Sequence, residues 1–239
     1  VTANNAEIIY GDEAIHNGVV YSGFVGGDSA DTLQLNPTIT IDYQQYEDVG
    51  RYSITPSLED TENYTFKIVD GTLRVNKKPV TFTWKYDSYV YDSKEKTVAA
   101  TVKGLVNGDQ VSVISSGYEQ TMGENPAINV GEYTTKVVSL FGEKAGNYMI
   151  ENTEETAYFD WAITEGMNYF TKAPVIDSWC YAQTPSEPVA EVAYGDNREI
   201  EFFYSTSRNG IYTTEKPTEA GTYYMKAKMA ATKNYSEAE

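Results

Sequence analysis

The sequence Val130-Gly131-Glu132-Tyr133 decides the fold of this chain, because the same pattern occurs three times. A strand-like run follows it at residues 134–140, and the pair Asn147-Tyr148 comes after that run. The other two copies begin at Val49-Gly50-Arg51-Tyr52 and at Ala220-Gly221-Thr222-Tyr223, and their glycines lie 81 residues before and 90 residues after Gly131. Because this period exceeds the roughly 20 to 50 residues of a solenoid repeat, the sequence predicts a tandem array of small domains, each with its own core.

The repeat motif consists of a glycine, a tyrosine two residues later, and an Asn-Tyr pair beyond the strand. Glycine allows the backbone to turn through a positive φ before the strand starts. We expect the tyrosine ring to be buried and its hydroxyl to bond a backbone group at the rim, as in the tyrosine corner of β-sandwiches. The asparagine is expected to hydrogen-bond a connecting loop. The motif residues are Gly50, Tyr52, Asn63, Tyr64, Gly131, Tyr133, Asn147, Tyr148, Gly221, Tyr223, Asn234 and Tyr235.

We predict three domains, at residues 1–77, 78–165 and 166–239. Lys77-Lys78-Pro79 marks the first boundary, because proline cannot donate to a β ladder. The second boundary is residues 165–174, which end in a proline. The first two domains each have a strand-like segment after their Asn-Tyr pair, whereas residues 236–239 are too few to form one. We therefore expect the third domain to be truncated at its C-terminus.

Apolar residues alternate with period two through most of the chain, and no segment has a 3.6-residue period over three turns. The turn pairs Asp70-Gly71, after residues 64–68, and Asn107-Gly108 predict two hairpins. Residues 179–181, with two aromatic side chains, predict a further strand. The predicted fold class is all-β, with three tandem small β-sandwich domains that are Ig-like or, as an alternative topology, β-grasp-like.

The chain is strongly acidic, with 35 acidic against 18 basic residues, a formal net charge of −17 and a pI near 4.4. Such a surface repels phosphate backbones, which argues against nucleic-acid binding. No apolar run reaches the roughly 18 residues of a membrane helix, so we expect no membrane insertion of these residues. Cys180 is the single cysteine, which excludes an intramolecular disulfide and fits either a reducing cytosol or a bacterial surface that does not rely on disulfides.

Each repeat resembles a known bacterial repeat family. The first carries Tyr10-Gly11-Asp12 and Gly71-Thr72-Leu73-Arg74-Val75, and it resembles an MBG-type repeat of the YGX kind. The second carries Tyr91-Asp92 and is similar to the related YDG type. The third, with Asn209-Gly210 and Lys216-Pro217-Thr218, is similar to bacterial Ig-like repeats. These resemblances imply a secreted or wall-attached bacterial protein, often an adhesin stalk, and they bring no catalytic residues.

Residue types that support catalysis are few or lack a site motif. His16 is the only histidine and lies in a polar turn, so we expect a solvated loop residue and not a catalytic base. Carboxylates that could serve a hydrolase occur in pairs, at Asp28 with Asp31 and at Glu154 with Glu155. No cleft motif surrounds either pair, and we expect surface residues.

The sequence contains candidate residues for two kinds of binding site. Ca²⁺ could bind Asp28, Asp31 or the turn Asn107-Gly108-Asp109, but no Asp-x-Asp-x-Asp-Gly loop is present, so no cofactor is expected and ordinary turn chemistry is favoured. Aromatic side chains could also stack on sugar rings, although their alternation on strands favours core packing. The aromatic candidates for ligand contact are Trp84, Tyr86, Trp179 and Tyr181.

Together these features predict a non-catalytic, monomeric fragment of a secreted or cell-surface bacterial adhesin-like protein. It would act as a stalk or spacer and in adhesion, with a host glycan or matrix protein as the partner. The alternative is a glycan-binding accessory module of a larger extracellular enzyme, which predicts an exposed cluster of Trp or Tyr. A third hypothesis, a hydrolase, predicts an acidic pocket around His16 or the paired carboxylates.

Overall fold

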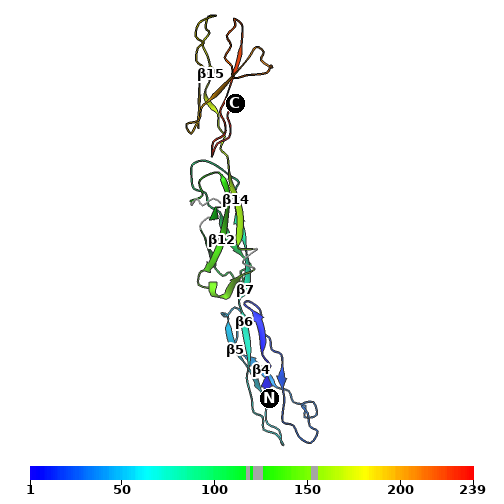
Figure 1. Cartoon of the computed structure of the whole chain (residues 1–239). Helices are drawn as coiled ribbons and strands as arrows, with labels where there is room; N and C mark the ends of the chain where they lie inside the picture. The colour runs from blue at the N-terminus through cyan, green and yellow to red at the C-terminus, as the bar shows by residue number, and fades with distance from the viewer. Residues whose placement is uncertain (117–118, 121–125, 152–155) are drawn as a thin grey trace. The chain divides into compact units, whose positions relative to one another are not determined.

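The computed structural model describes residues 1–116, 119–120, 126–151 and 156–239, and it confirms the all-β class (Figure 1). The helix in this part of the chain is one short 3-10 turn, η1 (Ala145–Asn147). None of the described helix is long and apolar enough to cross a membrane. The chain forms two compact units, the first comprising Val1–Lys85, Ala99–Ser116 and Thr135–Phe159, and the second comprising Tyr86–Val98, Gly117–Thr134 and Asp160–Glu239.

The first unit contains a four-stranded sheet, in which Figure 1 shows β4, β5 and β6 side by side. Its strands, in spatial order, are β2 (Ala6–Ile9), β6 (Gly71–Asn76), β5 (Gly50–Ser57) and β4 (Thr38–Ile41). β6 runs parallel to β2 and antiparallel to β5. Pro56 lies beyond the last pair of β5 with β6, Ile54 with Gly71, so its missing N–H interrupts no bond between these strands.

The remaining strands of the first unit come from both the first and the second repeat. β1 (Thr2–Ala3) pairs with β3 (Val19–Val20). β7 (Lys78–Lys85) lies between β13 (Tyr148–Ile150), to which it is parallel, and β9 (Ala99–Lys103), to which it is antiparallel. β10 (Ser112–Ser115) pairs with the last five residues of β12 (Gly131–Phe141). β12 itself contributes residues to both units.

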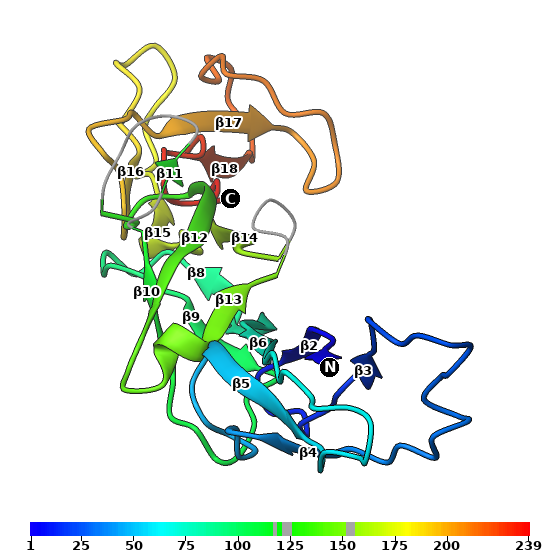
Figure 2. The same ribbon diagram turned by 90° about the horizontal axis from the view of Figure 1, so that it is seen from below.

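The second unit contains part of a five-stranded sheet and two two-stranded sheets. The start of β12 pairs with β11 (Glu119–Gln120), and β8 (Tyr89–Val90) pairs in parallel with the end of β14 (Tyr158–Thr164). The third repeat supplies two antiparallel pairs. These are β15 (Phe170–Val175) with β16 (Val189–Val192), and β17 (Glu201–Ser205) with β18 (Tyr224–Lys228), the latter two visible together in Figure 2.

One buried cluster in the first unit joins the first two repeats. Tyr10, Ile54 and Leu73 of the first repeat are fully buried in it, and Val80 and Tyr148 of the second repeat belong to the same cluster. Burial of apolar surface is the main favourable term in folding. These two repeats therefore share a continuous core, which differs from the separate cores that the repeat length alone suggests.

The prediction of a hairpin at Asp70-Gly71 is wrong. Residues 64–68 form no strand, and β6 pairs with β5 and β2. Val69 bonds the N-terminal segment instead, because its N–H donates to the Val1 carbonyl at 2.9 Å and its carbonyl accepts from the Ala3 N–H at 3.0 Å. A Cβ on Gly71 would lie 2.8 Å from the Ala3 carbonyl oxygen. Glycine is thus needed here for close backbone packing.

The Asn107-Gly108 turn forms, but the hairpin expected around it does not. Both residues have a positive φ, 53° and 71°, and the Asp109 N–H donates to the Val106 carbonyl at 3.0 Å. However, β9 before the turn pairs with β7, and β10 after the turn pairs with β12. The turn therefore connects two different sheets. A local turn signal fixes the direction of the chain but not the partner of each strand.

The strand predicted at Trp179 and Tyr181 is also absent, since residues 176–188 contain no strand. The first strand of this repeat lies earlier, at β15, and ends at Val175. Alternating side chains suit a strand, yet a ladder also needs a neighbouring strand to pair with. The structure assigns residues 176–181 no such pairing.

Candidate functional site at the repeat motif

The motif tyrosine makes the same bond in all three repeats. The hydroxyl of Tyr52 donates to the carbonyl four residues before it at 2.5 Å, that of Tyr133 at 2.6 Å and that of Tyr223 at 3.1 Å. Tyr133 is buried, and the other two rings are half-buried. The predicted hydroxyl-to-backbone bond is therefore confirmed. The positive φ expected at the motif glycine is wrong for Gly50 and Gly221, where the tyrosine ring instead lies 3.6 and 3.2 Å from the position that a Cβ would take. The hydroxyl bond closes the loop before each motif strand, because it spans the motif glycine.

The motif asparagine of the second repeat clamps the motif loop of the first. Asn147 is buried, and its side-chain oxygen accepts from the Val49 N–H at 2.9 Å. Its Nδ2 donates to the Asp48 carboxylate at 2.8 Å. Lys144 donates to the same carboxylate oxygen at 2.8 Å. This hydrogen bond from Lys144, followed by the one from Asn147, lowers the pKa of Asp48.

The third repeat clamps the second in the same way. The side-chain oxygen of Asn234 accepts from the Val130 N–H at 3.0 Å, and its Nδ2 donates to the side-chain oxygen of Asn129 at 2.9 Å. We call the contact between two successive repeats a junction. In both junctions the asparagine bonds the two residues that precede the motif glycine of the preceding repeat. The expected loop bond of this asparagine is found, but the loop belongs to the preceding repeat. We call this arrangement the asparagine clamp.

A tyrosine pair on one carboxylate completes the first junction. Tyr10 and Tyr148 meet edge to face, with ring centroids 5.4 Å apart, and their hydroxyls donate to the same oxygen of Asp109 at 2.9 and 2.6 Å. Burial, with the Asp109 hydrogen bond second, raises the pKa of Tyr148 to about 12 and raises the pKa of Tyr10 further. The carboxylate considered for calcium thus holds two tyrosines of neighbouring repeats.

The second junction uses aromatic stacking instead. Tyr235 lies parallel to Tyr194 with a centroid distance of 3.7 Å, and it meets Tyr91 edge to face at 5.2 Å. A Cβ on Gly166 would lie 2.9 Å from the Tyr235 ring, so a glycine admits this ring. Offset and edge-to-face rings are the favoured geometries of aromatic pairs. Tyr235 and Tyr148 are the tyrosines of corresponding Asn-Tyr pairs, but Tyr148 bonds a carboxylate whereas Tyr235 contacts aromatic rings.

Two families match consecutive parts of the chain, with residues 1–74 matching the MBG domain (YGX type) and residues 76–157 matching the YDG domain. The chain carries an MBG domain followed by a YDG domain. Comparison with curated proteins and with solved structures gave no match. MBG and YDG domains are typical of extracellular surface proteins. The first asparagine clamp is thus one of the contacts of the YDG domain with the MBG domain.

The MBG domain uses its own Asn-Tyr pair differently. Asn63 is exposed, and the Tyr64 hydroxyl donates to the Asp28 carboxylate at 2.8 Å. Asp28 was a calcium candidate, and here it accepts from a tyrosine of the same domain. Among the described residues, no group of three or more His, Cys, Asp and Glu side chains could hold a metal ion. The pair Glu154 and Glu155 lies outside the residues that the structure describes.

The aromatic candidates in the YDG domain are partly buried. Trp84 is stacked on Phe159, with centroids 5.3 Å apart and an angle of 14° between the rings. The Tyr86 hydroxyl donates to the Ala162 carbonyl at 2.9 Å. One face of the Trp84 ring therefore already has a protein partner, and the Tyr86 hydroxyl is already hydrogen-bonded. His16 is exposed at its turn, and its Nδ1 accepts from the Gly18 N–H at 3.3 Å.

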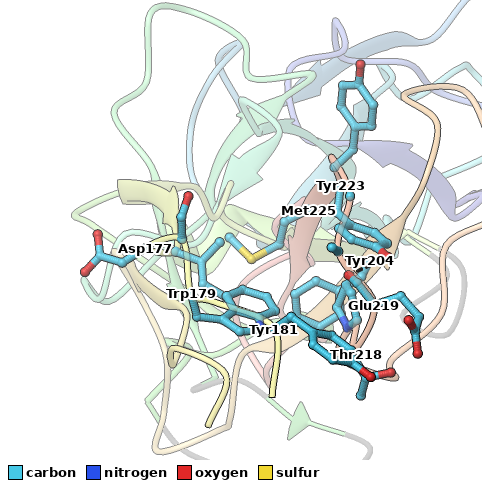
Figure 3. Close-up of a pocket in the computed structure, with 14 residues that line it drawn as sticks. Asp177, Trp179, Tyr181, Tyr204, Thr218, Glu219, Tyr223 and Met225 are labelled. Atoms are coloured by element: carbon cyan, nitrogen blue, oxygen red, sulfur yellow. Dashed lines mark hydrogen bonds between the residues drawn. The ribbon is translucent and has the colours of Figure 1, made fainter. Parts of the chain in front are cut away.

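The aromatic candidates of the third repeat line a cavity of about 310 Å³ (Figure 3). Trp179 is half-buried and Tyr181 is 67% exposed. They gather around the same space as Met225 of β18 and Tyr204 of β17. Cys180 between them is an exposed free thiol. Among the predicted ligand-contact residues, the structure thus brings Trp179 and Tyr181 together.

The partners of the clamp asparagines and one spacing that recurs within the chain are not among the predicted features. Asp48 and Asn129 stand two residues before a motif glycine, where the sequence contained no signal for a contact 99 or 105 residues away. The recurring spacing, in contrast, can be read directly from the sequence. The junction tyrosines Tyr10 and Tyr91 each precede their motif glycine by 40 residues, and Tyr181 precedes Gly221 by the same 40 residues. This spacing marks Tyr181 as the counterpart of two junction residues.

Proposed function

We propose that this chain is a non-catalytic spacer of a secreted or cell-surface bacterial adhesin-like protein. The asparagine clamp supports this function, because the same two side-chain bonds occur at both junctions between repeats. A side-chain amide that accepts a hydrogen bond from one backbone N–H and donates one to the side chain of the adjacent residue restrains the orientation of the loop in two directions. A repeated, directional junction of this kind resists bending and suits a segment that holds a distal binding region away from an envelope.

Charge and family support the proposed location. MBG and YDG domains are typical of extracellular surface proteins, and a formal net charge of −17 keeps such a chain soluble and separated from other acidic surfaces. Without a disulfide, its stability depends on the shared core and on the clamps.

Distance measurements across the first junction test the spacer. Spin labels at Glu59→Cys of the MBG domain and Lys103→Cys of the YDG domain, in a Cys180→Ser background, occupy exposed positions of the first unit. We expect a narrow distance distribution that broadens in Asn147→Ala, and no broadening in the control Asn63→Ala. A broad distribution in the unaltered chain, or no response to Asn147→Ala, would contradict the proposal.

The alternative, a glycan-binding accessory module, rests on Trp179 and Tyr181 beside the cavity in the third repeat. Aromatic faces next to polar groups suit sugar rings. Binding of the whole chain to an array of glycans and extracellular-matrix proteins separates the two functions. The spacer predicts no saturable binding, whereas saturable glycan binding that Trp179→Ala abolishes would establish the module.

A further inference from the structure

The strand by which the chain enters the MBG domain pairs with the strand by which it leaves. β2 runs parallel to β6 over four residue pairs. The pairing extends beyond these strands, because Thr2 forms a parallel bridge with Val69 and the Tyr10 N–H donates to the Asn76 carbonyl at 2.9 Å. We call this pairing, from Thr2 with Val69 to Tyr10 with Asn76, the entry–exit ladder.

Side chains cross the entry–exit ladder as well. The side-chain oxygen of Asn5 accepts from the Thr72 N–H at 2.8 Å. The Glu7 carboxylate accepts from Nδ2 of Asn76 at 3.1 Å and forms an ion pair with Arg74 at 3.9 Å. The two strands are therefore joined by side-chain bonds in addition to their backbone bonds.

One face of the entry–exit ladder is covered by the core. Ala6 and Ile8 of β2 are 3% and 6% exposed, and Leu73 and Val75 of β6 are 0% and 4% exposed. All four side chains belong to the buried cluster of the first unit. Breaking a hydrogen bond where water cannot replace it costs more than breaking one in water. The core thus protects the ladder from opening locally.

The relative direction of the two strands decides how the domain responds to tension on the chain. Tension pulls on the start of the entering strand and on the end of the leaving strand, in opposite directions. In a parallel pair these two points lie at opposite ends of the ladder, so the force runs along the strands and strains the evenly spaced bonds together. In an antiparallel pair they would lie at the same end, and the bonds would break one after another.

The second repeat has a shorter ladder of the same kind. β8 lies in the segment by which the chain enters this repeat, and it pairs in parallel with the end of β14, with Tyr89 opposite Ile163. The Tyr91 N–H donates to the carbonyl of Thr164, the last residue of β14, at 2.9 Å. Two repeats that match different families thus pair their entering and leaving segments in parallel.

We propose that this chain withstands tension, and that the entry–exit ladder is the element of the MBG domain that resists it. The inference rests on the proposed spacer function, because a spacer that is anchored at one end and holds a bound partner at the other is pulled along its length. Stiffness and tensile strength are nevertheless separate properties. The asparagine clamp restrains the orientation of successive repeats, whereas the entry–exit ladder sets the force at which the domain opens.

Pulling the MBG domain in two directions tests this proposal. DNA handles on pairs of cysteines, in the whole chain with Cys180→Ser, apply force in an optical trap. Thr2→Cys with Lys77→Cys pulls on opposite ends of the ladder, and Glu13→Cys with Lys77→Cys pulls on the same end. All three positions are exposed, so the substitutions should change stability little. We expect the first pair to require at least about twice the unfolding force of the second, because its ladder bonds must break together.

Two substitutions locate the bonds that resist the force. Asn5→Ala removes the bond to Thr72 across the ladder, and it should raise the unfolding rate at constant force on the first handle pair about tenfold. Thr40→Val is the control, because it removes a side-chain bond between β4 and β5, from the Thr40 hydroxyl to the Thr55 carbonyl at 3.3 Å. It should change this rate by no more than about twofold, since β4 and β5 stay paired while the ladder opens.

Equal unfolding forces for the two handle pairs would overturn the proposal, as would equal effects of Asn5→Ala and Thr40→Val on the unfolding rate. Neither result would contradict the spacer, because the spin-label distances across the first junction are measured without applied force. Conversely, a broad distance distribution together with a higher force for the first handle pair would support the ladder and contradict the spacer.

Discussion

The side-chain oxygen of Asn147 accepts a hydrogen bond from the backbone N–H of Val49 at 2.9 Å, although 98 residues separate them. Asn234 and Val130 repeat this relationship at 3.0 Å, 104 residues apart. A contact that recurs with the same atoms at two junctions indicates that the motif encodes the connection between repeats, and not only the fold of each repeat.

Removing a clamp should destabilise the chain. Asn147→Ala leaves the partly buried Val49 N–H without its acceptor, so we expect the free energy of unfolding of the transition that includes the first unit to fall by about 1–3 kcal/mol. Urea unfolding checks this value. Asn63→Ala, at the exposed counterpart, should change it by no more than about 0.5 kcal/mol. Equal effects of the two variants would show that the hydrogen bonds of Asn147 contribute nothing to the free energy of unfolding.

Alkaline pH should weaken the first junction. The pKa of Tyr148 is raised from its ordinary 10.0 to about 12, because burial and the Asp109 carboxylate favour the protonated phenol. A raised folded-state pKa gives stability that is complete below pH 10 and is lost as pH rises from 10 to 12. We expect Tyr148→Phe to reduce this pH dependence in urea unfolding. If the unfolding free energy of Tyr148→Phe depended on pH between 10 and 12 as steeply as that of the unaltered chain, Tyr148 would not be the group responsible.

Acid should weaken the ion pair of the same junction. The pKa of Asp48 is lowered, first by the hydrogen bond from Lys144, so its contribution is present above the ordinary carboxylate pKa and is lost as pH falls below it. Because both side chains are solvent-exposed, Lys144→Met should cost less than Asn147→Ala. Thermal unfolding of both variants at neutral pH ranks them, and the reverse order would contradict this account.

Gly71 should tolerate no side chain. In Gly71→Ala the new methyl group would lie 2.8 Å from the carbonyl oxygens of Ala3 and Asn4, so the N-terminal segment must shift. We expect a loss of about 1–3 kcal/mol of unfolding free energy, the usual range for overpacking. Gly146→Ala is the matched control, because a Cβ there meets nothing within 4 Å. Amide exchange of residues 1–4 should rise in the first variant and not in the second.

The sequence by itself determined the threefold repeat, the all-β class and the bond of each motif tyrosine to the loop before it. These features depend on residues within a few positions of one another, and local alternation, glycine positions and side-chain chemistry are visible in the chain. The MBG and YDG resemblances in the first two repeats rest on the same local patterns and were confirmed.

Tertiary structure decided which segments pair and what the motif asparagines bind. Asp70-Gly71 forms no hairpin, and Asn107-Gly108 forms a turn whose flanking strands do not pair with each other. A turn does not specify which strands its flanking segments pair with. The bonds of Asn147 and Asn234 join residues that lie 98 and 104 residues apart in the sequence. Such contacts follow from how whole strands pack against each other, and no local pattern carries that information.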